Sequence, residues 1–371
     1  MIKPIGIALT LFLLLLGWGI LGVGGLQSRD EPPKLAPVIY TPYPEITPRG
    51  YLCTRATGPI TIDGKLDDAA WTAAPWSEDF LDIEGISKPK PRFRTRMKML
   101  WDDQYLYIAA ELEEPHVWGT LTQHDSVIFH DNDFEVFLDP DSDSHLYGEL
   151  ELNVLNTTWD LLLSRPYKDG GRAIDAWEIK GLKSAIHING TLNDSRDTDH
   201  GWSIEIAWPW KSLAEISYVP CPPRASDQWR INFSRVEWRH EIVDGKYRKI
   251  KDTKEDNWVW SPQGVIDMHR PERWGVVQFS TLPAEKDSLR PDPSARSRYL
   301  LHRIYYAQRD FHKVRGRWAK TLDELQLTGP DFAAVRLETT SGGYEANLTR
   351  SIKPGKTERL SIRADGRIAK D

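Results

Sequence analysis

Short runs in which apolar and polar residues alternate recur between residues 94 and 279, and they constrain the fold more than any other feature. Alternation with a period of two is typical of strands that bury one face. Turn sequences rich in Asp, Gly and Pro separate the runs, and helical periodicity is scarce among them, with 210–216 the best helical stretch. The sequence predicts an all-β domain, an antiparallel β-sandwich of the immunoglobulin or jelly-roll kind. The predicted strands are 59–62, 94–101, 105–112, 134–138, 150–154, 183–188, 201–208, 228–236 and 274–279, with a further strand beginning at 158.

Composition divides the chain into four segments. Residues 1–27 are almost uninterrupted apolar residues after Lys3, long enough to span a bilayer, so they predict a membrane anchor or a signal peptide. Residues 28–50 form a Pro-rich linker, which we expect to be an extended tether. The β-sandwich then covers 51–285, and a small α+β module covers 295–371. We therefore expect an exported protein of the cell envelope, anchored in the membrane or secreted.

The C-terminal module is predicted from a change of periodicity. Apolar residues recur at helical spacing over 295–312, Thr321 is a suitable N-cap for a short second helix, and strands are expected at 343–348 and 360–363. The first helix and the residues after it are strongly basic. A solvated basic face and a contact with an acidic surface, of cell wall or protein partner, are both open interpretations. The basic residues are Arg296, Arg298, Arg303, Arg309, Lys313, Arg315 and Arg317.

Aromatic content and charge bear on the kind of ligand. The chain has 16 Trp, 13 Tyr and 10 Phe, more than a core alone requires, and its formal net charge is −6. An acidic protein is a poor match for nucleic acid, whereas exposed aromatic rings stack on sugars. This combination favours a polysaccharide or oligosaccharide as the partner and argues against nucleic acid.

The stretch 124–164 contains the clearest candidate site. Two predicted neighbouring strands present Glu135, Glu151 and Asn153 on one sheet face, beside the ring of Phe129 or Trp159. Carboxylates, an amide and an aromatic ring together suit a sugar. Three further tryptophans near the 228–236 strand are candidate stacking platforms, with core packing as the alternative. The predicted carbohydrate-binding residues are Phe129, Glu135, Glu151, Asn153, Trp238, Trp258 and Trp260.

Acidic turns suggest metal binding. Asp139, Asp141 and Asp143 lie two apart, as ligands do in calcium loops, although the glycine and glutamate of an EF-hand are missing. A solvated acidic turn is the alternative interpretation. Asp63 and Asp67 form a second, weaker candidate for calcium.

Two cysteines, Cys53 and Cys221, are present. In an oxidising compartment they could form one disulfide, and two separate buried thiols are the alternative.

Five motifs occur in order along the chain: Ile60 to Trp71, Leu100 to Tyr107, Asn132 to Asp139, Gly201 to Trp210 and Pro271 to Gly275. Together they resemble the family 9 carbohydrate-binding modules, in their family 9-like branch, over residues 51–280. The resemblance implies a β-sandwich that binds sugars without cleaving them, with structural calcium ions, commonly attached to xylanases and other plant-polysaccharide enzymes.

The resemblance also assigns site residues. Family members clamp a sugar between two tryptophans and hold it with a glutamate, an arginine and amides. The glutamate matches Glu135, Phe129 lies near the first clamp position, and Met268 lies near the second. Glu151 replaces the strand arginine, and Asn153 lies on the same strand.

Two other functions are left open by the residues. Glu135 and Glu151 on adjacent strands could act as the carboxylate pair of an O-glycosyl hydrolase. Related sandwiches bind haem, and Met97, Met99, Met268 or His269 could supply axial ligands. We expect a non-catalytic carbohydrate-binding protein that serves polysaccharide recognition or catabolism.

Overall fold

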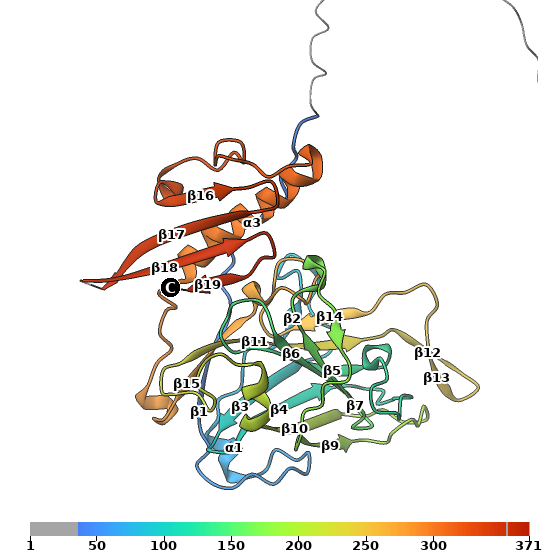
Figure 1. Cartoon of the computed structure of the whole chain (residues 1–371). Coiled ribbons are helices and arrows are strands. Elements are labelled where there is room, and N and C mark those ends of the chain that lie inside the picture. Colours follow the sequence, from blue (N-terminus) through green and yellow to red (C-terminus); the bar gives the residue numbers. More distant parts are fainter. Residues whose placement is uncertain (1–35, 354, 371) are drawn as a thin grey trace, which may run out of the picture. The chain divides into compact units, whose positions relative to one another are not determined.

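The structure is a computed structural model that describes residues 36–353 and 355–370 (Figure 1). The predicted membrane anchor or signal peptide, 1–27, lies outside the described residues, as does the start of the linker. Within the described part of the chain, no helix is both long and apolar enough to cross a membrane.

The predicted β-domain is built on one large sheet of 13 strands. The sheet is curled, so that one of its faces is turned inward (Figure 1). Its order is β8-β7-β6-β5-β11-β15-β1-β3-β4-β10-β9, with β14 attached to β11 and β2 to β14. The strands are β1 (Gly50–Arg55), β2 (Leu81–Asp82), β3 (Thr95–Trp101), β4 (Tyr105–Glu113), β5 (Asp133–Asp139), β6 (Tyr147–Asn153), β7 (Thr158–Leu163), β8 (Ala173–Ile174), β9 (Lys183–Asn189), β10 (Gly201–Pro209), β11 (Gln228–Glu237), β14 (Asp256–Val259) and β15 (Gly275–Ser280).

The all-β class is confirmed, but the purely antiparallel sandwich is corrected to one continuous mixed sheet. Strand β1, at the end of the predicted linker, runs parallel to both β15 and β3 and joins the two halves of the sheet. Its register pairs Tyr51 with Val277 and Thr54 with Leu100. Parallel partners are distant in sequence and share no tight turn, so local patterns do not reveal them.

The inner face of the sheet encloses the main hydrophobic core. On β5, Phe134, Val136 and Leu138 are fully buried in this core, as their alternation predicts. Glu135 and Phe137 therefore project to the other face. A second, smaller hydrophobic cluster lies on that other face and contains Phe137, Tyr147, Leu161, Leu163 and Trp274.

The segment 59–71 is held by a buried glutamate. The predicted strand 59–62 is absent, and the motif instead forms a turn followed by helix α1 (Ala69–Ala73). Glu205 on β10 accepts hydrogen bonds from the Trp71 indole at 2.7 Å and from the Asp63 and Gly64 amides at 2.9 and 2.8 Å. Two motifs far apart in sequence thus meet at one carboxylate.

One further local prediction is confirmed, and one hairpin was not predicted. The helical stretch 210–216 is confirmed as α2 (Trp210–Leu213) followed by a 3-10 turn, Ala214–Ile216. The hairpin of β12 (His240–Val243) and β13 (Lys246–Lys249) has no counterpart among the predicted strands. The remaining 3-10 helices are Ile128–His130, Tyr167–Asp169, Pro271–Arg273, Ala284–Lys286 and Pro330–Phe332.

The C-terminal module has one helix, α3 (Ala295–Arg315), packed on an antiparallel sheet (Figure 1). Its strands are β16 (Val335–Thr339), β17 (Tyr344–Lys353), β18 (Lys356–Arg363) and β19 (Ile368–Lys370). The predicted second helix is wrong. The Thr321 hydroxyl does accept a hydrogen bond from the Glu324 amide at 3.2 Å, but the segment forms only turns.

Two basic side chains of α3 form ion pairs with acidic groups of the same chain. Arg296 binds Glu45 and Asp331 at 2.7 and 2.5 Å, and Arg309 binds Asp169 at 2.5 Å. The predicted linker is also more than a tether, because Val38, Tyr40 and Tyr43 pack against the core of the module. The acidic surface expected for the basic helix is thus supplied by its own chain at these positions.

The predicted disulfide is corrected, because both cysteines are free. Cys53 on β1 is fully buried in the main core. The Cys221 thiol lies near the Trp210 carbonyl at 3.3 Å, so each sulfur has its own separate environment.

Candidate functional site

Four carboxylates gather on the face of the sheet that points away from the main core. The register of β5 and β6 places Glu135 opposite Glu151, with Asp133 and Glu149 two residues before them on the same side of each strand. Their exposed fractions are 6% for Glu135, 2% for Glu151, 0% for Asp133 and 3% for Glu149. The sequence pattern identified the two paired glutamates and missed the other two. The period of two that selected Glu135 and Glu151 would have included them.

The hydrogen bonds of this carboxylate cluster, Asp133, Glu135, Glu149 and Glu151, are incomplete. Glu151 accepts from the Phe129 amide at 2.9 Å, and Asp133 accepts from the Val236 amide at 3.1 Å. The second oxygen of Asp133 and one oxygen of Glu149 are buried without a hydrogen-bond partner. No ion pair among the described residues includes any of the four carboxylates.

The electrostatics follow from this burial. Loss of hydration raises the pKa of Glu135 to about 7, because the charged form is poorly solvated. Burial and the neighbouring negative charges also hold the pKa values of Asp133, Glu149 and Glu151 well above the usual carboxyl range. The four carboxyl groups therefore cannot all be ionised here unless a cation compensates their charges. Without a cation, some of them must hold a proton.

Aromatic side chains lie next to the cluster. Phe129 and Trp159 are partly exposed, with ring centroids 6.4 Å apart. The Trp238 indole donates to the Phe129 carbonyl at 2.8 Å, and the Lys249 amine lies 3.8 Å from the Trp238 ring centroid. Three partly exposed rings therefore accompany the carboxylates, which is the combination that the sequence indicated for a sugar.

Asn153 has a structural task in this arrangement. Its amide donates to the Leu121 carbonyl at 2.8 Å and to Asp131 at 3.0 Å, and its oxygen accepts from the Leu155 and Thr157 amides. The side chain is fully buried. It therefore fixes the loop before β5 and offers no free donor to a ligand.

Trp258 and Trp260 lie apart from the candidate site. They are 3% and 0% exposed and belong to the main core, so neither presents a ring face to solvent. Gly275 on β15 explains part of this packing, because a Cβ there would lie 2.2 Å from the Trp260 ring. Of the three tryptophans near β11, the structure brings only Trp238 to the carboxylates.

The acidic turn after β5 is a separate group. Asp139, Asp141 and Asp143 each offer an oxygen, all within 4.8 Å of one another. One Asp139 oxygen is buried without a hydrogen-bond partner, whereas Asp143 already binds Arg367 at 2.7 Å. Burial raises the pKa of both Asp139 and Asp141, so the turn has the donor oxygens and the excess negative charge that a cation requires.

Outside the acidic turn, one predicted group of metal ligands is not assembled and one group that was not predicted is. Asp63 and Asp67 are not among the groups of three or more metal-binding side chains that the described residues bring together, whereas His124, Asp160 and Glu178 form such a group. The sequence prediction missed this histidine group, because its members come from three separate segments.

The residues considered for haem lie in two different places. Met97 and Met99 are fully buried in the main core. Met268 lies beside the smaller cluster on the other face, and the nearby His269 ring bonds the Tyr147 hydroxyl at 2.9 Å.

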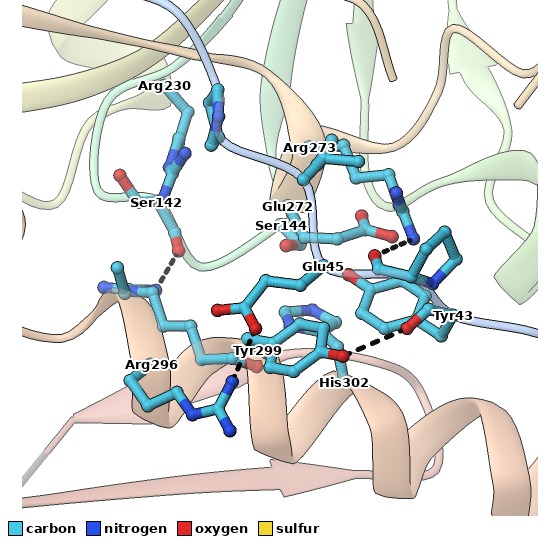
Figure 2. A pocket seen from close by; sticks show the side chains of 15 residues that line it. Tyr43, Glu45, Ser142, Ser144, Arg230, Glu272, Arg273, Arg296, Tyr299 and His302 are labelled. Atoms are coloured by element: carbon cyan, nitrogen blue, oxygen red, sulfur yellow. Dashed lines mark hydrogen bonds and ion pairs between the residues drawn. The ribbon is translucent and has the colours of Figure 1, made fainter. Parts of the chain in front are cut away.

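A cavity of about 100 Å³ lies elsewhere, where the segment 43–48 passes α3 (Figure 2). Arg296 bonds Glu45 there, and the Arg273 guanidinium lies 4.1 Å from the Tyr43 ring centroid. None of the predicted sugar-binding residues lines this cavity. Two of its arginines donate to backbone carbonyls, Arg273 to that of Pro44 at 3.4 Å and Arg298 to that of Ser142 at 2.5 Å.

Comparison with known proteins gives matches to a xylanase and an exoglucanase. Residues of the chain are 24% identical over 164 positions to endo-1,4-beta-xylanase A of Thermoanaerobacterium saccharolyticum, covering 44% of this chain and 12% of that protein. They are 25% identical over 171 positions to exoglucanase XynX of Acetivibrio thermocellus, covering 45% and 13%. The matched region is thus a small part of each relative.

A solved structure and a family model complete the comparison. A family 9 carbohydrate-binding module of Caldicellulosiruptor kristjanssonii in complex with cellotriose is 15% identical, with a TM-score of 0.39, covering 66% of this chain and all of that one. The model described as carbohydrate family 9 binding domain-like matches residues 62–280, more than half of the chain. The chain therefore belongs to the carbohydrate family 9 binding domain-like family, as its five motifs predicted.

Proposed function

We propose that this protein binds a polysaccharide or oligosaccharide, without cleaving it, at the face formed by Glu135, Glu151, Phe129, Trp159 and Trp238. The observation that carries the proposal is the pairing of Glu135 with Glu151 beside three partly exposed rings. Aromatic faces stack on the apolar faces of sugar rings, and carboxylates accept hydrogen bonds from hydroxyl groups. Family membership points to the same class of ligand.

The test uses the full chain and a Glu135→Gln variant. Cellotriose, glucose, xylan and cellulose are suitable probes, in view of the names of the similar proteins. Because charge-assisted hydrogen bonds are worth about 1.5–3 kcal/mol, we expect the variant to bind at least about tenfold more weakly in calorimetry or pull-down. Glu338→Gln, an exposed substitution on β16, serves as the matched control and leaves affinity unchanged.

The same incubation separates binding from hydrolysis. New reducing ends that appear with the wild-type protein and disappear with Glu135→Gln would show an O-glycosyl hydrolase instead. An affinity that Glu135→Gln leaves intact for every bound glycan would place the site elsewhere.

Calcium at the acidic turn is a further part of the proposal. The family resemblance implies structural calcium, and Asp139, Asp141 and Asp143 fit it, because one Asp139 oxygen is buried without a partner. The ion would compensate the charges of the turn. That turn also contacts the C-terminal module through Arg367 and through the Ile368 amide, which bonds the Asp143 carbonyl at 3.0 Å.

Export completes the proposal. The apolar segment 1–27 supports a membrane anchor or a signal peptide, with the sugar-binding domain on the outer side of the membrane.

A further inference from the structure

The carboxylate cluster presents an electrostatic problem that the protein alone does not solve. Four acids are at least 94% buried on adjacent strands, and no ion pair of the described residues includes them. Lys249 lies near, but its amine faces the Trp238 ring at 3.8 Å. Burying an ionised carboxylate without a compensating cation costs several kcal/mol, so at neutral pH this cluster requires protons or a cation.

The geometry of three of these acids suits a metal ion. Asp133, Glu135 and Glu151 each offer one oxygen, and the three oxygens lie within 4.8 Å of one another. Oxygen ligands lie about 2.3–2.6 Å from Ca²⁺, so two of them on one ion are separated by at most about 5 Å. The three oxygens can therefore share one ion of this size.

Two unpartnered oxygens point to the same conclusion independently of the clustering. The Asp133 oxygen that does not bond the Val236 amide is buried without a partner, and Asp133 is fully buried. Glu149, outside the group of three and 3% exposed, also has a buried oxygen without a partner. Buried carboxylate oxygens are rarely left unbonded, and each such case calls for an explanation, of which a bound ion is one.

We propose that Asp133, Glu135 and Glu151 bind a divalent cation of the calcium type, with Glu149 adding negative charge beside it, and that sugar binding depends on this ion. The site differs from the acidic turn, which uses Asp139, Asp141 and Asp143. Hard oxygen donors select Ca²⁺ or Mg²⁺ over softer metals, and three carboxylates with flexible side chains suit the larger ion.

The dependence of sugar binding rests on the function proposed above. Because these carboxylates are nearly inaccessible, a sugar reaches few of their oxygens directly. An ion held by three acids has coordination positions left over, since Ca²⁺ takes six to eight oxygen ligands. Hydroxyl groups of a sugar at the aromatic rim can occupy those positions.

The experiment measures Ca²⁺ binding to the full chain, purified in detergent and freed of metal with a chelator. The starting protein carries Asp141→Asn, which weakens the other candidate site. We expect calorimetry to detect a bound Ca²⁺ in this protein. Adding Asp133→Asn and Glu151→Gln should weaken that binding at least about tenfold, because two of three charged ligands are lost. No Ca²⁺ binding, or equal binding in both proteins, would overturn the proposal.

A folding control accompanies the test. Neutralising two buried acids should leave the melting temperature in chelator unchanged or higher, whereas a misfolded variant melts lower. If the multiple variant fails to fold, Glu149→Gln replaces it, because this change leaves all three ligands in place. It should weaken Ca²⁺ binding severalfold, and an unchanged affinity would contradict the proposal.

Sugar titrations with and without Ca²⁺ separate this inference from the proposed function. Sugar binding that persists in chelator would overturn the dependence on the ion and leave the sugar site intact. Ca²⁺ binding without affinity for any glycan would instead support the ion site and remove its role in sugar recognition.

Discussion

Strand β11 separates two groups of buried charges that are balanced in opposite ways. On the core side, Arg235 binds Glu114 and Glu237, both at 2.9 Å, and all three side chains are at most 2% exposed. On the other side, Ser234 pairs with Glu135 of the carboxylate cluster, and no ion pair of the described residues includes those acids. The first group is compensated by two cations, because Arg235 binds both carboxylates and Arg92 lies 3.8 Å from Glu237, and this arrangement suits a structural task. The second group has no cation of its own and lies beside the rings of Phe129, Trp159 and Trp238. Such an arrangement is typical of a ligand-binding site.

The largest expected effect tests the compensated group. Arg235→Ala removes the cation that Glu114 and Glu237 share and leaves only Arg92, 3.8 Å from Glu237, so the free energy of unfolding should fall by about 3–5 kcal/mol. Urea denaturation of the full chain measures this loss. As a control, Arg196→Ala removes a surface ion pair, which is screened by solvent, and should leave the stability nearly unchanged. Similar losses in the two variants would show that the buried triad contributes no more than a surface pair.

The next prediction concerns a third buried charge environment, around His302 on α3. Burial lowers the pKa of His302 to about 4, and its surroundings include Glu272, Lys168 and Arg298, with the Tyr43 and Tyr305 rings against it. The unfolded chain takes up a proton near pH 6.5 and the folded chain does not. Stability is therefore expected to fall as the pH drops from about 6.5 towards 4, by about 3 kcal/mol for this group.

Urea denaturation between pH 7 and pH 4 checks this slope. His302→Leu removes the titrating group, so the variant should lose less stability on acidification than the wild type, and the exposed His187→Leu serves as the matched control variant. Identical slopes in wild type and His302→Leu would refute the prediction. The difference between proteins is the informative quantity, because the raised pKa values of the carboxylate cluster act in the opposite direction.

The smallest expected effect tests the uncompensated group. In a buffer with chelator at pH 8, Glu149→Gln should raise the free energy of unfolding by about 1 kcal/mol, because it removes a buried charge without a partner. Glu237→Gln, made in the compensated group, should not stabilise the protein, since one Glu237 oxygen accepts from Arg235 and the other lies 3.8 Å from Arg92. A loss of stability in Glu149→Gln would show that a proton or an internal cation already balances the cluster.

Much of the fold was predictable because side-chain alternation is a local property. Phe134 and Val136 face the core, Glu135 and Glu151 face away from it, and the sequence shows this directly. A helix over 295–312 was similarly evident from its apolar spacing, and α3 extends it to Arg315. The site was only partly predictable. Glu135 and Glu151 were found together, whereas Asn153 and Trp260 were indistinguishable from ligand-binding residues until their partners and burial were known.

What the sequence determined by itself was therefore the alternation of the strands that it identified, the faces of their side chains and the family. Tertiary structure alone decided that β1 inserts in parallel between β15 and β3 and that the sheet is continuous. It also decided which carboxylates are compensated, Glu205 by three N–H groups and Glu237 by Arg235, and that those of the carboxylate cluster are not. The physical reason is that burial and pairing depend on contacts between residues far apart in the chain, and a local sequence pattern contains no information about those contacts.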